Sequence, residues 1–224
     1  MFEVITAFLN QWGDEIAEAI IATIQMVVIA LGISIVIGLP LGILLVLTRP
    51  GKSLENKYFF LFLNTLINTI RSIPFIILLF FILPFTKLIA GTTIGVQGVI
   101  VPLVVSCSPY IARLMESALL EVDRGVIEAY EAMGIKPRSI IWHVLVREAR
   151  PGIILGLTIA TISLIGETAM AGLVGAGGLG DLAYRFGHLR YEVDVMYVTV
   201  FILIIMVQSI QTFGNRMSAR MKKG

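Results

Sequence analysis

Long apolar segments alternate with short polar segments along this chain of 224 residues. Five of the apolar segments are long enough to cross a bilayer as helices, each of which needs about 20 residues. The predicted spans lie at about residues 19–48, 68–88, 94–115, 153–172 and 195–213. The pattern therefore predicts an all-α integral membrane protein with five transmembrane helices, built as a single transmembrane domain that covers residues 1–224.

The first predicted span is longer than the membrane is thick. No charged residue lies between Ala19 and Thr48. A helix of about 30 residues is about 45 Å long, whereas the hydrocarbon core of a bilayer is about 30 Å thick. We therefore expect this helix to tilt or to bend, and Pro40, between two glycines, is the expected bend. The residues before it are expected to form a short amphipathic lead-in at the membrane surface.

Composition and charge narrow the class of protein. Hydrophobic residues make up 57% of the chain and charged residues 14%, which excludes a soluble domain of this length. The net charge of +2 is too small to suggest nucleic acid as a partner, and the basic residues lie where lipid headgroups would contact them. The single cysteine, Cys107, excludes an internal disulfide.

The distribution of basic residues predicts the orientation in the membrane. With the C-terminus in the cytoplasm, the inner segments hold 13 of the Lys and Arg residues, and Lys87, Arg185 and Arg190 lie outside. Because cytoplasmic loops carry an excess of positive charge, we expect the N-terminus outside and the C-terminus in the cytoplasm. This orientation places the polar segment 119–151 on the cytoplasmic side.

The polar segment 119–151 is predicted to form two short helices. Apolar residues recur at three- and four-residue steps along the first helix, at Leu119, Val122, Val126, Ile127 and Tyr130. Gly134 is expected to end that helix in the left-handed conformation, and Pro137 is expected to open the second helix. The second helix is predicted at about 138–149, with an apolar face made by Ile140, Ile141, Val144 and Leu145.

The sequence of this segment resembles the EAA loop of ABC-importer permeases. The string EAYEAMG spans Glu128–Gly134, and VLV at 144–146 and ARPG at 149–152 follow it. The chain departs from the family's pattern at Tyr130, where alanine is usual, and at Arg147, where proline is usual. Without the resemblance, the segment reads as an ordinary cytoplasmic helical hairpin between two spans.

The resemblance implies that this loop docks into a cleft of a separate ATPase subunit. It implies that Glu128, Ala129 and Gly134 couple the ATPase to transport, and Arg124 and Arg138 are expected to pair with acidic groups of that subunit. No GxxxxGK[ST] string occurs in the chain, so ATP is expected to bind to the partner. The chain is therefore predicted not to be an enzyme, and to have no cofactor, catalytic residue or metal site of its own.

Four further strings are similar to the permease subunit of the methionine importer family. They are RSIPFIILL at 71–79, IVPL at 100–103, ARLMESALLEV at 112–122 and GLVGAGGLGDL at 172–182. This resemblance implies the type I ABC importer permease fold, as a homodimer in the lipid of the bacterial cytoplasmic membrane. It also implies two copies of the ATPase and an extracytoplasmic binding protein that delivers an amino acid.

Glycines are concentrated after the fourth predicted span. Gly175, Gly177, Gly178 and Gly180 fit the GxGxxG pattern of dinucleotide-binding loops. The pattern here follows a membrane helix on the outer side and opens no βαβ unit, so a nucleotide site is not expected. We interpret these glycines as a tight outer loop that acts as a gate.

One carboxylate, Glu167, is predicted to lie inside the fourth span. It follows Gly152, at the inner boundary, by about 22 Å of helix, which places it in the outer half of the membrane. An ionised carboxylate costs roughly 2.5–3.5 kcal/mol in lipid, so we expect Glu167 to face a partner or a water-filled cavity. One interpretation is a hydrogen bond to Ser163, Thr168 or a neighbouring helix. The other places Glu167, Ser163 and Met170 on the translocation path near the dimer axis.

The identity of the cargo depends on Glu167. Methionine permeases usually carry a neutral residue at the matching position, and a carboxylate there would favour a cationic or amine-bearing solute. The predicted cargo is therefore an amino acid that is either methionine-like or polar or cationic, such as histidine. The alternative function is a stand-alone proton-coupled secondary transporter with Glu167 as its proton site. The EAA-like loop and the absence of a detectable inverted repeat disfavour that alternative.

Overall fold

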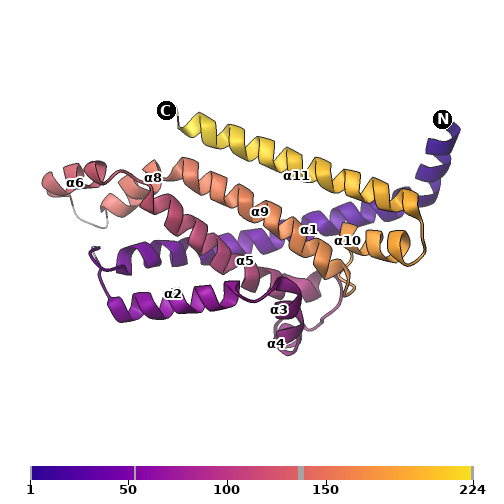
Figure 1. Cartoon of the computed structure of the whole chain (residues 1–224), viewed down its shortest axis with the longest axis horizontal. Coiled ribbons are helices and arrows are strands. Elements are labelled where there is room, and N and C mark those ends of the chain that lie inside the picture. The colour runs from indigo at the N-terminus through magenta and orange to yellow at the C-terminus, as the bar shows by residue number, and fades with distance from the viewer. Residues whose placement is uncertain (1, 53, 136–138, 223–224) are drawn as a thin grey trace. The chain divides into compact units, whose positions relative to one another are not determined.

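Helices are the only regular secondary structure in the part of the chain that the structure describes, residues 2–52, 54–135 and 139–222 (Figure 1). The structure is a computed structural model. The all-helical prediction is therefore confirmed for these residues. The helices are α1 (Phe2–Thr48), α2 (Lys57–Arg71), α3 (Phe75–Phe81), α4 (Leu83–Ala90), α5 (Gly95–Leu120), α6 (Arg124–Ala132), η1 (Ile140–Leu145), α8 (Val146–Glu148), α9 (Arg150–Gly172), α10 (Gly178–Leu182), η2 (Ala183–His188) and α11 (Val193–Met221).

Four of the described helices are long and apolar enough to cross a membrane. They are the part of α1 from Asn10 to Thr48, α5, α9 and α11. A fifth span results if the bent pair of α2 and α3 is counted as one crossing. The lengths and composition of the helices thus agree with the predicted all-α membrane protein, and α1, α5, α9 and α11 overlap four of the five predicted spans.

The second predicted span, 68–88, is not a single helix. α2 ends at Arg71 and α3 begins at Phe75, and the two helices are bent by 102° relative to each other. Pro74 precedes α3, and proline interrupts a helix because it has no backbone N–H and restricts the residue before it. Pro84 lies in the first turn of α4, where the missing N–H costs nothing. The two prolines therefore divide an apolar segment that the pattern of hydrophobic residues presents as continuous.

The chain before the first predicted span is also part of a helix. α1 begins at Phe2 rather than near residue 19, and it continues through Pro40 to Thr48. Trp12 and Ile16 are buried, with 9% and 8% of their surface exposed. The expected lead-in is therefore part of α1 and is packed through Trp12 and Ile16, and its position at the membrane surface stays a prediction.

The helices divide into two compact units. The first comprises residues 1–32, 73–105 and 161–209, and the second comprises residues 33–72, 106–160 and 210–224. Because α1, α5, α9 and α11 are continuous, each of them contributes residues to both units.

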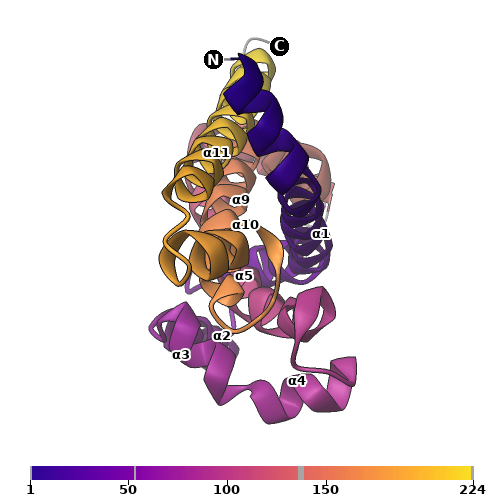
Figure 2. The same cartoon turned by 90° about the vertical axis from the view of Figure 1, so that its right-hand side faces the viewer.

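The core of the first unit lies where α1, α10, η2 and α11 meet. The rings of Trp12 and Phe186 make an edge-to-face contact with centroids 4.9 Å apart, a geometry that adds to the gain from burial alone. The buried residues of this cluster are Trp12, Ile16, Ala19, Leu179, Leu182, Phe186 and Val195. A hydrogen bond from Leu179 to Thr23 joins α10 to α1 in this unit, and Figure 2 shows both helices.

The second unit depends on a close approach of α1 to α5. A Cβ atom added at Gly38 would lie 2.7 Å from the carbonyl oxygen of Ser108, and one added at Gly42 would lie 2.6 Å from that of Ala112. Glycine is thus required because the two backbones leave no space for a side chain.

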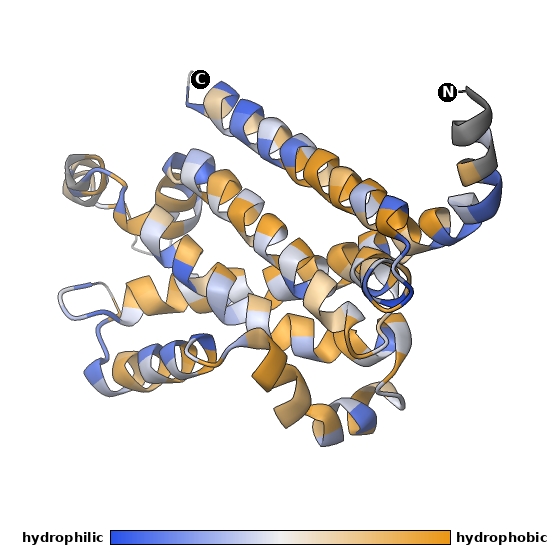
Figure 3. Cartoon of the chain, turned by 45° about the vertical axis from the view of Figure 1, so that its right-hand side comes forward, coloured by the Kyte–Doolittle hydropathy of each residue, from blue (hydrophilic) through white to orange (hydrophobic). Residues whose placement is uncertain are grey.

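Hydropathy follows the membrane pattern in this unit as well. Figure 3 shows a hydrophilic C-terminal end of α11 after its apolar middle.

We predict that Gly42→Ala lowers the melting temperature of the purified chain in detergent, whereas Gly32→Ala does not. The added methyl group at position 42 must displace the backbone of α5, and overpacking of this kind costs roughly 1–3 kcal/mol. A Cβ atom at Gly32 meets no atom within 4 Å, and alanine is the better helix former. Thermal unfolding measured side by side tests the pair, and equal melting temperatures would contradict the close approach.

Candidate functional site

The start of α6 is fixed by a local hydrogen bond. The carboxylate of Asp123 accepts a hydrogen bond of 2.7 Å from the backbone N–H of Gly125. A side chain in this position satisfies one of the free N–H groups in the first turn of a helix. α6 therefore begins at Arg124, inside the segment predicted to form the coupling loop.

The end of α6 is closed by Gly134, as the sequence predicts. Gly134 has a φ of +72°, which is the left-handed region that glycine adopts without strain. The N–H of Ile135 donates to the carbonyl of Tyr130 over 3.3 Å, which is the hydrogen bond of a Schellman cap. Both ends of α6 are thus specified by the sequence next to them.

The second half of the loop packs on the core of the second unit. The predicted apolar face is buried, with 4% to 6% of each residue exposed, and comprises Ile140, Ile141, Val144 and Leu145. Ile141 and Leu145 belong to one cluster with Met115 and Leu119 of α5. The loop is therefore joined to α5 by close-packed apolar contacts, which transmit a displacement with little loss.

The helix in this half is not the α-helix that the sequence predicts at 138–149. Residues Ile140–Leu145 form the π-helix η1, followed by the short α8. A π-helix has a wider turn than an α-helix, and this turn accommodates four buried side chains within six residues. Position 138 lies outside the described residues, so the prediction for Arg138 has no structural counterpart.

The opposite surface of the loop is exposed. Glu128 and Ala129 lie on the exposed side of α6, and the side chain of Arg124 is not among those described. Two large apolar residues, Met133 and Trp142, are 65% and 63% exposed. Sequence reasoning did not single them out, although both lie off the buried stripe, and exposed apolar side chains of this size are typical of docking surfaces.

The predicted path residues share one face of α9. Ser163, Glu167 and Met170 follow one another at steps of four and three, which places them on one side of the helix. Ser163 and Met170 are exposed, and Glu167 is half-buried. The structure thus brings the three side chains together on a surface of this chain.

The glycine-rich loop is held tightly against α1. Gly175, Gly177 and Gly178 all have positive φ angles, between +78° and +82°. A Cβ atom at Gly178 would lie 2.7 Å from the hydroxyl oxygen of Thr23. That hydroxyl accepts a hydrogen bond of 2.9 Å from the N–H of Leu179, at the start of α10.

Thr23, which the sequence analysis did not identify, therefore fixes the loop. Its hydroxyl also donates to the carbonyl of Ala19 over 2.9 Å, so the oxygen serves both helices. Gly180 lies inside α10, against the backbone of Ala169. The signal in the sequence is one threonine in an apolar span, which is too common to be identified without the fold.

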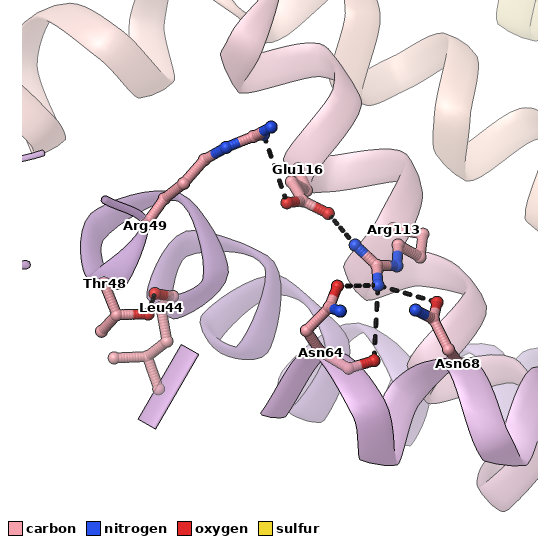
Figure 4. A network of polar contacts seen from close by, with 7 residues as sticks. All are labelled: Leu44, Thr48, Arg49, Asn64, Asn68, Arg113 and Glu116. Carbon is pink, nitrogen blue, oxygen red and sulfur yellow. Dashed lines mark hydrogen bonds and ion pairs between the residues drawn. The ribbon is translucent and has the colours of Figure 1, made fainter. Parts of the chain in front are cut away.

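A second feature that the sequence analysis missed is a network of charged and amide side chains in the second unit (Figure 4). The guanidinium of Arg113 donates to the carboxylate of Glu116, one turn further along α5. It also donates to the side-chain oxygens of Asn64 and Asn68 of α2, the latter over 2.7 Å. Arg49 approaches the other oxygen of Glu116 at 3.8 Å.

This network accounts for a buried charge within a membrane helix. Glu116 is 6% exposed, and an unpaired carboxylate at such a position is strongly unfavourable. Arg113 and Arg49 offset this charge, and the side-chain oxygens of Asn64 and Asn68 in α2 accept hydrogen bonds from one guanidinium nitrogen of Arg113. The network thereby fastens α2 to α5.

The chain is similar to known proteins over most of its length. The family model for the binding-protein-dependent transport system inner membrane component matches residues 38–223. The "Probable D-methionine transport system permease protein MetI" of Vibrio cholerae is 44% identical over 216 residues, which cover 95% of this chain and 96% of that protein. The methionine import system permease protein MetP of Bacillus subtilis is 47% identical over 173 residues, 77% of this chain and 78% of that protein.

A solved structure gives the same result for the fold. A chain in an inward-facing conformation of the MetNI methionine ABC transporter superposes with a TM-score of 0.92. It is 43% identical in sequence, and the match covers 94% of this chain and 98% of that chain. The resemblance to methionine-importer permeases and the type I permease fold, both stated from sequence motifs, are therefore confirmed.

We predict that Arg113→Met destabilises the chain far more than Arg49→Met. Removal of Arg113 leaves the buried Glu116 with one distant partner, and breaking a buried pair costs roughly 3–5 kcal/mol. Arg49 is 45% exposed, and exposed pairs contribute about 0–1 kcal/mol.

The measurement is thermal unfolding of the two variants in detergent, with the double variant Arg113→Met, Glu116→Met as control. The double variant contains no buried unpaired charge, so it should recover part of the loss. Equal melting temperatures for Arg113→Met and Arg49→Met would show that Glu116 does not depend on Arg113.

Proposed function

Since this chain belongs to the family of binding-protein-dependent transport system inner membrane components, we propose that it is the permease subunit of an ATP-driven importer of methionine. The observation that carries the proposal is the match, over nearly the whole chain, to a chain of the methionine transporter MetNI. The permeases for D-methionine and methionine in Vibrio cholerae and Bacillus subtilis support the same cargo.

The proposed assembly contains two copies of this permease, two ATPase subunits and an extracytoplasmic methionine-binding protein. ATP binds to the ATPase subunits, and this chain performs no covalent chemistry. The exposed Met133 and Trp142 on the cytoplasmic loop support a docked subunit there, because the centres of protein interfaces are enriched in such residues.

The proposed orientation has the N-terminus outside and the C-terminus in the cytoplasm. The support is the excess of basic residues in the inner segments. It includes Arg216 and Arg220, which lie exposed in the hydrophilic end of α11. The coupling loop and the end of α11 are then on the same side as the ATPase.

The mechanism is alternating access driven through the loop. Closure of the ATPase pair displaces α6 at its exposed side, where Glu128 and Ala129 lie. The buried side carries the displacement to α5 through Ile141, Leu145 and their contacts. Because packed interfaces rearrange as rigid bodies, the spans rotate and open the cavity toward the binding protein.

The proposed path for the cargo follows the face of α9 that carries Ser163, Glu167 and Met170. Two such faces, one from each copy, would line the path near the dimer axis. The outer end is closed by the gate loop from Gly175 to Gly180, which Thr23 holds against α1. A thioether side chain suits the apolar part of this face, and Glu167 suits the ammonium group of an amino acid.

We predict that Gly134→Pro abolishes ATP-dependent uptake while the chain still folds and assembles. Proline cannot adopt the φ of +72° found at Gly134, so the Schellman cap opens and the loop loses its shape. Gly134→Asn is the matched control because asparagine tolerates the left-handed conformation, and it should retain most of the uptake. Normal uptake in Gly134→Pro, measured in vesicles with unchanged ATPase content, would contradict the coupling role.

The proposed function itself is tested by uptake of labelled methionine into vesicles that contain the permease, its ATPase and its binding protein. Uptake should require ATP and should persist when a protonophore discharges the proton gradient. Excess unlabelled methionine should abolish it, and excess histidine should not. Uptake that needs the proton gradient instead of ATP would establish the secondary transporter. Stronger competition by histidine than by methionine would indicate that histidine is the cargo.

The same assay with Glu167→Gln tests the path. Loss of the carboxylate should lower methionine uptake at least threefold, whereas Glu192→Gln, an exposed carboxylate outside the α9 face, should not. Wild-type rate and selectivity in Glu167→Gln would remove Glu167 from the path.

A further inference from the structure

A cavity of about 710 Å³ lies in the second unit beside the first turn of chain after α1. Its apolar walls come from the cytoplasmic ends of two spans and from the coupling loop, and the apolar lining residues with accessible surface include Leu47, Leu120 and Ile127. Arg49 and Lys52 line it as well, in the linker between α1 and α2. The cavity therefore combines an apolar wall with cationic groups at the level where α1 leaves the membrane.

Arg49 is held in place at this wall. Its guanidinium lies 3.8 Å from a carboxylate oxygen of Glu116, which is itself held by Arg113. Arg49 remains 45% exposed, so its other donors are available to a ligand. A cation that is oriented before binding loses less conformational freedom when it binds.

Lys52 supplies the second cation. It is half-buried, and its ammonium group makes no ion pair or side-chain hydrogen bond within the described part of the chain. Glu128, the one carboxylate among the residues that line the cavity, is exposed at the rim. The lining therefore carries two positive charges and one negative charge, which favours an anion.

We propose that this cavity binds an anionic phospholipid of the cytoplasmic leaflet, with its phosphate between Arg49 and Lys52 and an acyl chain along Leu120 and Ile127. The charge of the lining selects a ligand with a net negative charge. The apolar walls select one with a hydrocarbon part, which inorganic phosphate does not have. The position at the membrane boundary supplies that ligand from the bilayer.

The bound lipid would join the linker after α1 to the coupling loop. Residues of both segments line the cavity. A bound acyl chain would therefore fill the apolar space between the linker and the loop. We therefore expect the lipid to stabilise the loop in the position that faces the ATPase.

The test is native mass spectrometry of the full-length chain, purified in mild detergent with the subunits that accompany it. The delipidated protein is titrated with phosphatidylglycerol and, separately, with phosphatidylcholine. Phosphatidylglycerol should remain bound, and the double variant Arg49→Gln, Lys52→Gln should lower the bound fraction at least tenfold. Lys57→Gln is the matched control, because Lys57 is an exposed lysine nearby that does not line the cavity.

Three outcomes would overturn the proposal. They are equal retention in the wild type and the double variant, an equal loss in Lys57→Gln, and equal retention of phosphatidylcholine. Since Arg49 also contacts Glu116, the single variant Lys52→Gln decides the case if the double variant does not fold. A loss of threefold or more in that variant supports the site, and no loss overturns it. The measurement does not use transport, so its outcome is independent of the proposed cargo.

Discussion

The structure depends on the requirement that every backbone polar group in a membrane find a partner within the protein. Within the long helices, the backbone groups bond to one another. The ends of the helices are therefore the places where side chains must supply the partners. The side chain of Asn56 accepts a hydrogen bond from the N–H of Phe59 at the start of α2. The hydroxyl of Ser72 donates to the carbonyl of Asn68 at its end, and Thr23 receives the N–H of Leu179 at the start of α10. Polar side chains thus take up the free backbone groups at the ends of α2 and at the start of α10.

A similar requirement applies to charged side chains, because a buried charge also needs a partner within the protein. The charged residues within α5 meet it. Arg113 and Glu116 neutralise each other one turn apart, and the amides of Asn64 and Asn68 complete the set. Burying these charged groups removes them from water, which is unfavourable, but their contacts hold α2, α5 and the linker at Arg49 together. Arg49 belongs both to this network and to the lining of the cavity, and Glu116 lies one turn before the end of α5, from which the segment 119–151 continues.

The sequence was sufficient at most of the places where the physical cause is local. The apolar pattern identified the long helices, Gly134 identified the end of α6, and the periodicity identified the buried face from Ile140 to Leu145. It failed wherever the cause lies elsewhere in the chain. The π-helix η1 depends on the shape of the core beneath it, and the contact of Thr23 with Leu179 joins residues 156 positions apart. The division of the predicted span 68–88 at Pro74 was missed for another reason. The span was assigned from the hydropathy of the residues around Pro74, although the proline itself is visible in the sequence.

The described residues of the segment 119–151, which we propose to be the coupling loop, form one buried face and one exposed face. Its helix α6 is capped at both ends by the residues that flank it, Asp123 and Gly134, so both ends are fixed by contacts within the chain. One face is closely packed on α5, where an apolar interior resists compression. The other face presents Glu128 and Trp142 to the exterior. Because the buried face is packed on Met115 and Leu119 of α5, the proposed coupling mechanism would carry a push on the exposed face into a movement of α5.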